Sequence, residues 1–219
     1  LWILFAGFLS ICQLNAAIKE KLSLAIKKAK GVIKIDGILD EDAWKNANVA
    51  SDFFQSFPYD TSYSVTRTEV MVTFDDIHIY VGAVCYDELP GDFIIQSLKR
   101  DFSYPVSDAF AVYIDPFNDH LNGFSFGVNP LGVQREGLIQ GGGGFGVTTS
   151  WDNKWFSEVK HYDGYWIVEM AIPFKSIRYN AEATTWGVNF SRNDLKRNES
   201  SSWSIPFASI SFAEGMLRK

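Results

Sequence analysis

Apolar residues alternate with polar ones through most of the chain, and this period of two is what most constrains the fold. Five stretches show it clearly: TRTEVMVTFDD, HIYVGAVCYD, SDAFAVYID, GYWIVEMAIP and TTWGVNFSRND. Successive side chains of a β-strand point to opposite faces, so each stretch predicts a strand with one buried face. Turn residues such as Leu89-Pro90-Gly91 and Asp163-Gly164 separate the strands. Because strand–helix alternation is absent from the sequence, we predict an all-β fold, an antiparallel β-sandwich of jelly-roll type.

The alternation also predicts which residues form the core. The expected inward residues are Val70, Val72, Phe74, Ile79, Val81, Ala83, Cys85, Phe110, Val112, Ile114, Trp166, Val168, Met170, Ile172, Trp186, Val188 and Phe190. Cys85 is expected to pack there as a small apolar residue, which leaves no disulfide framework in the mature chain. One short N-terminal helix is predicted in LDEDAWKNA, whose first turn is acidic as the helix dipole favours.

The composition is that of a globular domain with enough apolar material for a core. Of the 219 residues 47% are hydrophobic and 16% are aromatic. The net charge of −6 argues against a nucleic-acid partner, because phosphate backbones are bound by basic surfaces.

The first residues, LWILFAGFLSICQLNAA, are typical of a secretory signal. They have an apolar stretch over residues 1–11, followed by the small residues Ala16 and Ala17. A membrane-spanning helix needs about 20 apolar residues, more than this stretch contains. We therefore divide the chain into a partial signal peptide (1–17), a basic lead segment (18–31), a β-sandwich (32–206) and the start of a truncated C-terminal region (207–219).

Four aspartates fall within RDFSYPVSDAFAVYIDPFND, which raises the question of acid/base catalysis. Asp108 and Asp115 bracket one predicted strand, and seven extended residues separate them by about 23 Å. The carboxylate pairs of glycosidases stand about 5 to 9.5 Å apart. We therefore interpret these aspartates as strand-end and turn residues. A structural calcium ion near Asp115 and Asp119, or near Asp75 and Asp76, is an open alternative.

Other motifs do not indicate catalysis or a cofactor. The glycine-rich LIQGGGGFGVTTS is not followed by a helix that could receive a phosphate, so it predicts a loop overhanging a site. The histidines at 78, 120 and 161 lack the spacing of a metal site or catalytic triad. Aromatic residues beside predicted loops are the remaining signal, since flat rings stack on sugars. They are Tyr104, Trp151, Trp155 and Trp203.

The chain resembles the family 9 carbohydrate-binding module-like domains. It is similar above all to those at the N-terminus of secreted Gram-negative proteins with a C-terminal outer-membrane β-barrel. The matching segments are IKIDGILDEDAW, RTEVMVTFDDIHIYVGAVCYD, RDFSYPVSDAFAVYIDPFND, FSFGVNPLGVQREG, SWDNKW, GYWIVEMAIPFKSIRY, WGVNFSRN and ESSSW, in this order over residues 32–206. The resemblance implies a β-sandwich exported to the periplasm, outer membrane or cell surface of a Gram-negative bacterium. It also implies a fragment that ends at Lys219, before the outer-membrane region of the full-length protein.

The resemblance further implies a sugar site. In the family two tryptophans sandwich a terminal sugar; Trp203 matches one of them and Tyr104 stands in place of the other. Ala111 and Gly127 stand where a glutamate and an arginine of the family hold hydroxyls. The candidate carbohydrate-binding residues are Tyr104, Asp108, Asn129, Trp151 and Trp203.

Three functions follow as hypotheses. The first is a non-catalytic carbohydrate-binding module linked to carbohydrate catabolism, with Trp203 and Tyr104 in an open groove under the loop at residues 141–146. The second is a periplasmic interaction or plug domain that has lost sugar binding. The third is part of a glycoside hydrolase whose catalytic domain lies elsewhere.

Overall fold

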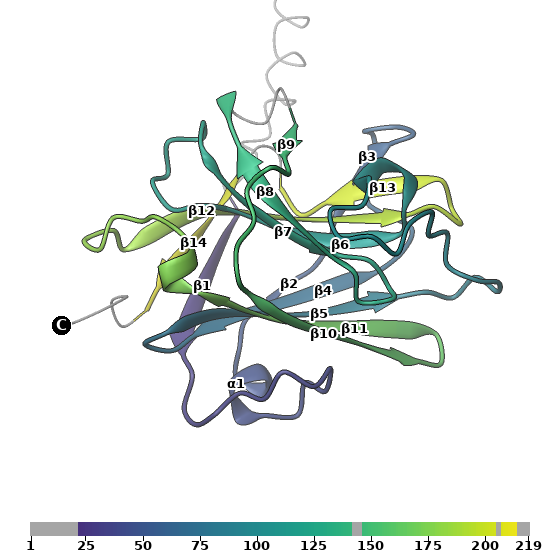
Figure 1. Ribbon diagram of the computed structural model, residues 1–219. Helices are drawn as coiled ribbons and strands as arrows, with labels where there is room; N and C mark the ends of the chain where they lie inside the picture. Colours follow the sequence, from purple (N-terminus) through teal and green to yellow (C-terminus); the bar gives the residue numbers. More distant parts are fainter. Residues whose placement is uncertain (1–21, 142–145, 205–206, 214–219) are drawn as a thin grey trace, which may run out of the picture.

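The computed structural model describes residues 22–141, 146–204 and 207–213 (Figure 1). The strands in these ranges form a 14-stranded sheet that curls into two packed layers, here called the first and the second sheet (Figure 1). The first sheet contains β9 (Val147–Thr148), β8 (Gln134–Ile139), β7 (Gly123–Val128), β6 (Ala109–Asp115), β12 (Thr185–Asp194), β14 (Ala208–Phe212), β13 (Glu199–Ser202) and β3 (Phe54–Phe57). The second contains β10 (Phe156–Tyr162), β11 (Tyr165–Pro173), β5 (His78–Tyr86), β4 (Thr68–Phe74) and β2 (Val49–Ala50). The predicted β-sandwich is confirmed.

Strand β1 (Ser23–Lys28) joins the two sheets. Its first part pairs in parallel with β14, and Lys27 and Lys28 pair in parallel with β4. The other strand pairs are antiparallel among the described residues. Strands β1 and β14 belong to the same sheet as the other strands. The sandwich therefore begins before residue 32 of the chain and ends after residue 206.

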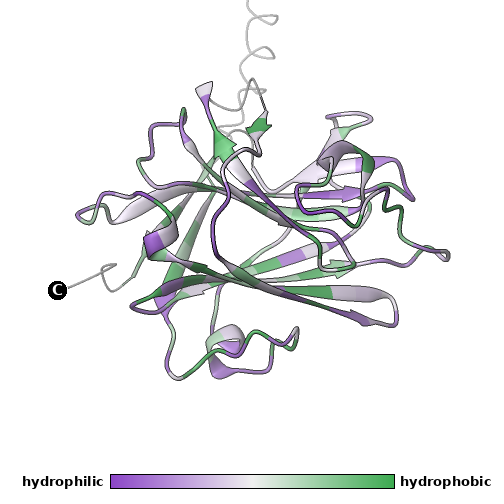
Figure 2. Ribbon diagram, viewed as in Figure 1, coloured by the Kyte–Doolittle hydropathy of each residue, from purple (hydrophilic) through white to green (hydrophobic). Residues whose placement is uncertain are grey.

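The predicted inward residues form the core between the sheets. None of the seventeen is more than 2% exposed, and they belong to one apolar cluster. Figure 2 shows the resulting alternation of apolar and polar positions along the strands. Cys85 lies in this cluster as a free thiol, and its burial raises the pKa of the thiol to about 12.

The N-terminal segment covers the outer face of the second sheet. The predicted helix is present but short, α1 (Asp42–Lys45), and Trp44 packs beside Ile33 and Tyr80. No helix within the described ranges is long and apolar enough to span a membrane.

Glu169 on β11 anchors this segment. Its buried carboxylate accepts the N–H groups of Asp36 and Gly37 at 2.9 and 3.0 Å, and the indole N–H of Trp44 at 3.2 Å. Burial raises the pKa of Glu169 to about 7, although the three donors act in the opposite direction. The anchoring carboxyl therefore takes up a proton more readily in the folded than in the unfolded chain.

Arg192 connects the sheets at one end of the sandwich. It is 3% exposed and extends from β12 of the first sheet into the interior. Its guanidinium donates hydrogen bonds to the carbonyls of Arg67 and Tyr86 and to the hydroxyl of Thr68, where β4 begins and β5 ends in the second sheet.

Glu169 predicts a pH dependence of stability. Since its folded pKa lies above its unfolded value near 4.5, its contribution is fully present below pH 4.5 and is lost as the pH rises through 7. The free energy of unfolding of the wild type, minus that of Glu169→Gln, should fall by about 3 kcal/mol between pH 4.5 and 8. Urea denaturation at several pH values measures this difference. Glu158→Gln is the matched control, because it makes the same substitution at an exposed residue directly opposite Glu169 on β10. A pH dependence for Glu169→Gln no larger than that for Glu158→Gln would contradict the raised pKa of Glu169.

Candidate functional site

The outer face of the first sheet carries a continuous row of side chains across six strands. The register places the residues of this row side by side, in the order Arg135, Gly127, Ala111, Ser191, Ser202 and Phe54. Neighbouring strands lie about 4.8 Å apart, so the row is about 24 Å long. We call this surface, with the rows beside it, the polar face.

Two further rows flank the first on the same face. They consist of Asn189, Tyr113, Ser125 and Gly137 on one side, and of Phe57, Ser200, Asn193 and Ala109 on the other. The centre of the polar face therefore offers hydroxyl and amide groups. Asp115 follows Tyr113 on the same face of β6. Its carboxylate oxygens accept the N–H groups of Phe117 and His120.

Each end of the polar face is bordered by a different element. At one end a Cβ on Gly137 would lie 2.5 Å from the carbonyl oxygen of Thr148, so β9 crosses closely over β8. At the other end are β3 and the loop that follows it, with exposed rings that we call the aromatic rim: Phe57, Tyr59 and Tyr63, which are 50%, 71% and 66% exposed. Figure 1 shows β8 and β9 on one side of this sheet and β3 on the other.

Tyr104 lies on the polar face and is fixed there by hydrogen bonds. It begins a 3-10 turn (Tyr104–Val106), and its carbonyl accepts the side-chain amide of Asn193 at 2.7 Å. Its hydroxyl lies 2.7 Å from the hydroxyl of Ser191, which donates in turn to the hydroxyl of Tyr113 at 3.2 Å. Burial raises the pKa of both tyrosines, so both hydroxyls keep their protons near neutral pH.

The ring of Tyr104 fills the space between Ser191 and Arg135. Its centroid is 6.0 Å from the Arg135 guanidinium, while its hydroxyl contacts Ser191. Only Ala111 and Gly127 separate Ser191 from Arg135 in the row. The small residues at these two positions therefore make room for a ring supplied by a loop.

Two buried polar atoms of the polar face have no hydrogen-bond partner among the described residues. They are Nε of Arg135, beside the Tyr104 ring, and the hydroxyl of Ser125, which stands opposite Tyr113. Buried polar groups are nearly always paired, so atoms of this kind mark a place where a bound molecule can supply the partner.

The aromatic candidates from the sequence do not meet on one surface. Trp203 is 6% exposed and packs on Phe190 at 5.5 Å between centroids, inside the core. Tyr104 stands on the opposite face of the same sheet, so the two rings do not line one groove. Trp151 is half-buried and packs against the core residues Phe124 and Phe126. Residues 142–145 of the glycine-rich loop expected above the groove lie outside the described residues.

The polar candidates Asp108 and Asn129 stabilise loops by accepting hydrogen bonds from backbone N–H groups. The buried Asp108 carboxylate accepts the N–H groups of Ile94 and Leu195 at 2.7 and 2.6 Å, and burial raises its pKa. Asn129 accepts the N–H groups of Leu131 and Val133 at 3.0 Å across the β7–β8 turn, while its own buried amide nitrogen has no partner. The interpretation of Asp108 as a strand-end residue is confirmed. Sugar contact by the five candidates stays a prediction.

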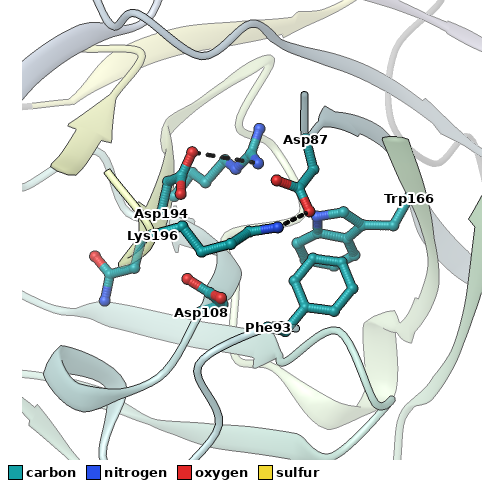
Figure 3. A pocket seen from close by; sticks show the side chains of 8 residues that line it. Asp87, Phe93, Asp108, Trp166, Asp194 and Lys196 are labelled. Atoms are coloured by element: carbon teal, nitrogen blue, oxygen red, sulfur yellow. Dashed lines mark hydrogen bonds and ion pairs between the residues drawn. The ribbon is translucent and has the colours of Figure 1, made fainter. Parts of the chain in front are cut away.

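Asp108 belongs to a closed charged cluster at one end of the sandwich (Figure 3). The ammonium of Lys196 donates to the Asp87 carboxylate at 2.5 Å and to the carbonyls of Leu89 and Gly91, and it lies 5.0 Å from the ring centroid of Phe93. The lining side chains fill the space between the loops and leave no room for a ligand. The cluster is therefore a structural contact between loops.

The part of the chain that the structure describes contains no cluster of acidic residues for the calcium ion considered above. No group there of three or more His, Cys, Asp or Glu residues could hold a metal ion. The Asp75 carboxylate accepts the N–H groups of Ile77 and His78 and the hydroxyl of Tyr80, and Asp119 is bonded within its own turn.

The sequence reasoning missed Tyr113, Arg135 and Ser191. The side chain of each points away from the core. Along its strand, each alternates with residues that were assigned to the core or that pair with core residues on the neighbouring strand. The alternation that predicts the core could also have predicted this outward set, once the strands were aligned with one another.

The geometry defines a β-sandwich module with a hydroxyl-rich outer face and no pair of catalytic carboxylates on that face. The chain belongs to the carbohydrate family 9 binding domain-like family, whose model matches residues 35–208. This is a family of non-catalytic modules, in agreement with the expectation that the chain is not itself an enzyme.

Solved structures share this fold at low sequence identity. A family 9 carbohydrate-binding module from Caldicellulosiruptor kristjanssonii in complex with cellotriose is 17% identical, with a TM-score of 0.62 over 87% of this chain and 93% of that one. A complex of a family 9 module from the same organism with glucose is 18% identical, with a TM-score of 0.62 over 87% and 95%. A structure from Bacteroides uniformis is 14% identical, with a TM-score of 0.64 over 87% and 98%. No curated protein matches the chain.

The burial of Trp203 predicts a large effect on stability. Trp203→Ala should lower the free energy of unfolding by about 3–5 kcal/mol, because it leaves a cavity in the core. Tyr63→Ala removes an exposed ring and should change it by less than about 1 kcal/mol. Urea denaturation followed by far-UV circular dichroism measures both. Equal, small effects of the two substitutions would place the Trp203 ring at the surface instead.

Proposed function

We propose that the chain is a non-catalytic module that binds carbohydrate on the polar face of its first sheet. The observation that carries this proposal is the row from Arg135 to Phe54, which combines hydroxyl groups with aromatic rings on one surface. Sugars are recognised by this combination, since rings stack on their apolar faces and polar side chains bond their hydroxyls.

The hydrogen-bonding groups suit the hydroxyls of a sugar. The hydroxyls of Tyr104, Tyr113 and Ser191 are linked in a chain, and each hydroxyl can both donate and accept. Such a chain can extend to a ligand hydroxyl without a change of protonation. The neighbouring Ser202 on β13 is partly exposed and carries a further hydroxyl.

Family membership and fold support the proposal. The family is defined by carbohydrate binding, and two structures of the same fold are complexes with cellotriose and glucose. We infer that β-glucan oligosaccharides are the first ligands to test. Catalysis is left to other domains in this proposal.

Calorimetric titration with cellotriose, glucose and a panel of plant and bacterial oligosaccharides tests the proposal. At least one saccharide should bind. If the folded protein bound none of them, the proposal would fail, and the alternative of an interaction domain without sugar binding would be favoured.

Removing hydroxyls from the polar face should weaken the binding. Tyr104→Phe and Ser191→Ala should each reduce affinity for the best saccharide about fivefold, because each removes hydrogen bonds worth about 1 kcal/mol. Tyr165→Phe on the second sheet is the matched control and should leave affinity unchanged, since Tyr165 lies on β11. Equal affinities for all three variants and the wild type would show that the ligand binds elsewhere.

We also propose that the protein is exported, on the strength of the apolar residues 1–11 and the small residues Ala16 and Ala17. This segment lies outside the described residues. A fusion of residues 1–31 to a periplasm-dependent reporter enzyme tests the proposal, and a reporter retained in the cytoplasm would contradict it.

A further inference from the structure

Arg135 on the polar face is a cation without a counter-ion. Within the described residues its side chain forms no ion pair and donates no hydrogen bond, and its carbon Cζ lies 6.0 Å from the centroid of the Tyr104 ring. The other partly or fully buried arginines of the sheets are paired with carboxylates, and so are several lysines. Examples are Arg67 with Glu69, Arg100 with Glu136, Arg192 with Asp194, and Lys196 with Asp87.

The Asp115 carboxylate on the polar face is too distant to neutralise Arg135. The carboxylate of Asp101 lies nearer and accepts the N–H group of Glu136, but within the described residues it forms no ion pair with Arg135. Asp115 lies on β6, whereas Arg135 lies on β8, two strands away. Along β6, Asp115 is also four residues beyond Ala111, the residue that shares a row with Arg135. Two strand spacings and four residues correspond to about 16 Å. The Asp115 oxygens are in addition occupied by the N–H groups of its own turn.

The guanidinium is also partly removed from water. Its Nε is buried and has no acceptor, and the unpaired hydroxyl of Ser125 lies on the adjacent strand of the same face. A buried donor without a partner is unfavourable, and a charged donor more so. An anion bound beside Arg135 would supply the acceptor and the opposite charge together.

We propose that the saccharide bound on the polar face is anionic, and that Arg135 receives its carboxylate or sulfate group. This inference rests on the proposed function and names the ligand class of that site. A sugar lying against Tyr104 has the guanidinium within reach, because the Arg135 carbon Cζ is 6.0 Å from the ring centroid. Arginine suits such a group because its planar fork can bind two oxygens at once.

The ligand charge is tested with matched trisaccharides. The probes are cellotriose, the β-1,4-linked trisaccharide of glucuronic acid, and cellotriose carrying a 6-sulfate. Calorimetry at low and at moderate salt should show at least tenfold tighter binding of one of the anionic trisaccharides than of cellotriose. The ratio of the affinity for this anionic trisaccharide to the affinity for cellotriose, here called the anionic advantage, should decline with salt, since salt screens charge interactions. The affinity for cellotriose should not. Comparison of the carboxylate with the sulfate shows which anion the site selects.

Variants of Arg135 assign the charge preference to this residue. Arg135→Gln should abolish the anionic advantage, so that the anionic trisaccharides bind this variant no more tightly than cellotriose does, whereas Arg135→Lys should retain part of the advantage. Arg178→Gln is the matched control, because Arg178 is exposed and lies in the connection before β12. Unchanged thermal midpoints establish that the variants are folded.

Two outcomes overturn the proposal, and they are distinguishable. If cellotriose binds as tightly as both anionic trisaccharides, and Arg135→Gln has no selective effect, the anionic ligand is excluded while carbohydrate binding stands. If none of the three binds and the wider saccharide panel also fails, carbohydrate binding itself is excluded.

Discussion

The apolar contact between the two sheets is the interaction on which the rest of the structure depends. Each long strand gives alternate residues to this contact, so its remaining residues face outward as a consequence. A slip of one residue in any strand would exchange the two sets and place polar groups in the core. The energy of the core therefore also fixes the register of the outer rows, where Arg135, Ser191 and Tyr113 become neighbours although they are far apart in the chain. The polar face is thus held by contacts that no ligand touches.

The chemistry of the polar face comes from two kinds of element. The strands supply a flat array of small and hydroxyl-bearing residues, and loops supply the rings at its centre and its edge. Tyr104 is the central example, since a 3-10 turn places its ring over the strands and the hydroxyl of Ser191 holds it there. The arrangement suits binding because its donors are pre-positioned by the sheet. It offers no pair of carboxylates for acid/base catalysis, in keeping with a family of non-catalytic modules.

The sequence predicted local features well and distant contacts poorly. The core phase of AFAVYID follows from neighbouring residues alone, and the structure confirms it. The place of Trp203 depends on the pairing of β13 with β12, because this pairing turns the ring toward Phe190 and the core. Strand β1 was assigned to a basic lead segment, since its lysines mask Leu24 and Ile26, which alternate with them and are buried. Likewise Arg135 gains its position near Tyr104 only when β8, β7 and β6 are aligned, and one sequence does not specify that alignment.

The small residues under Tyr104 bear on how this surface can change in evolution. A Cβ on Gly127 would lie 3.3 Å from the Cβ of Ala111, and the Tyr104 ring occupies the space above both. The family resemblance associates a glutamate and an arginine with these two positions. Neither side chain could replace Ala111 or Gly127 while the Tyr104 ring stayed in place. The three positions therefore form a coupled set, in which a larger side chain at position 111 or 127 requires a smaller one at position 104. The order of substitutions at this surface therefore matters, because the loop residue has to change before either strand residue can enlarge.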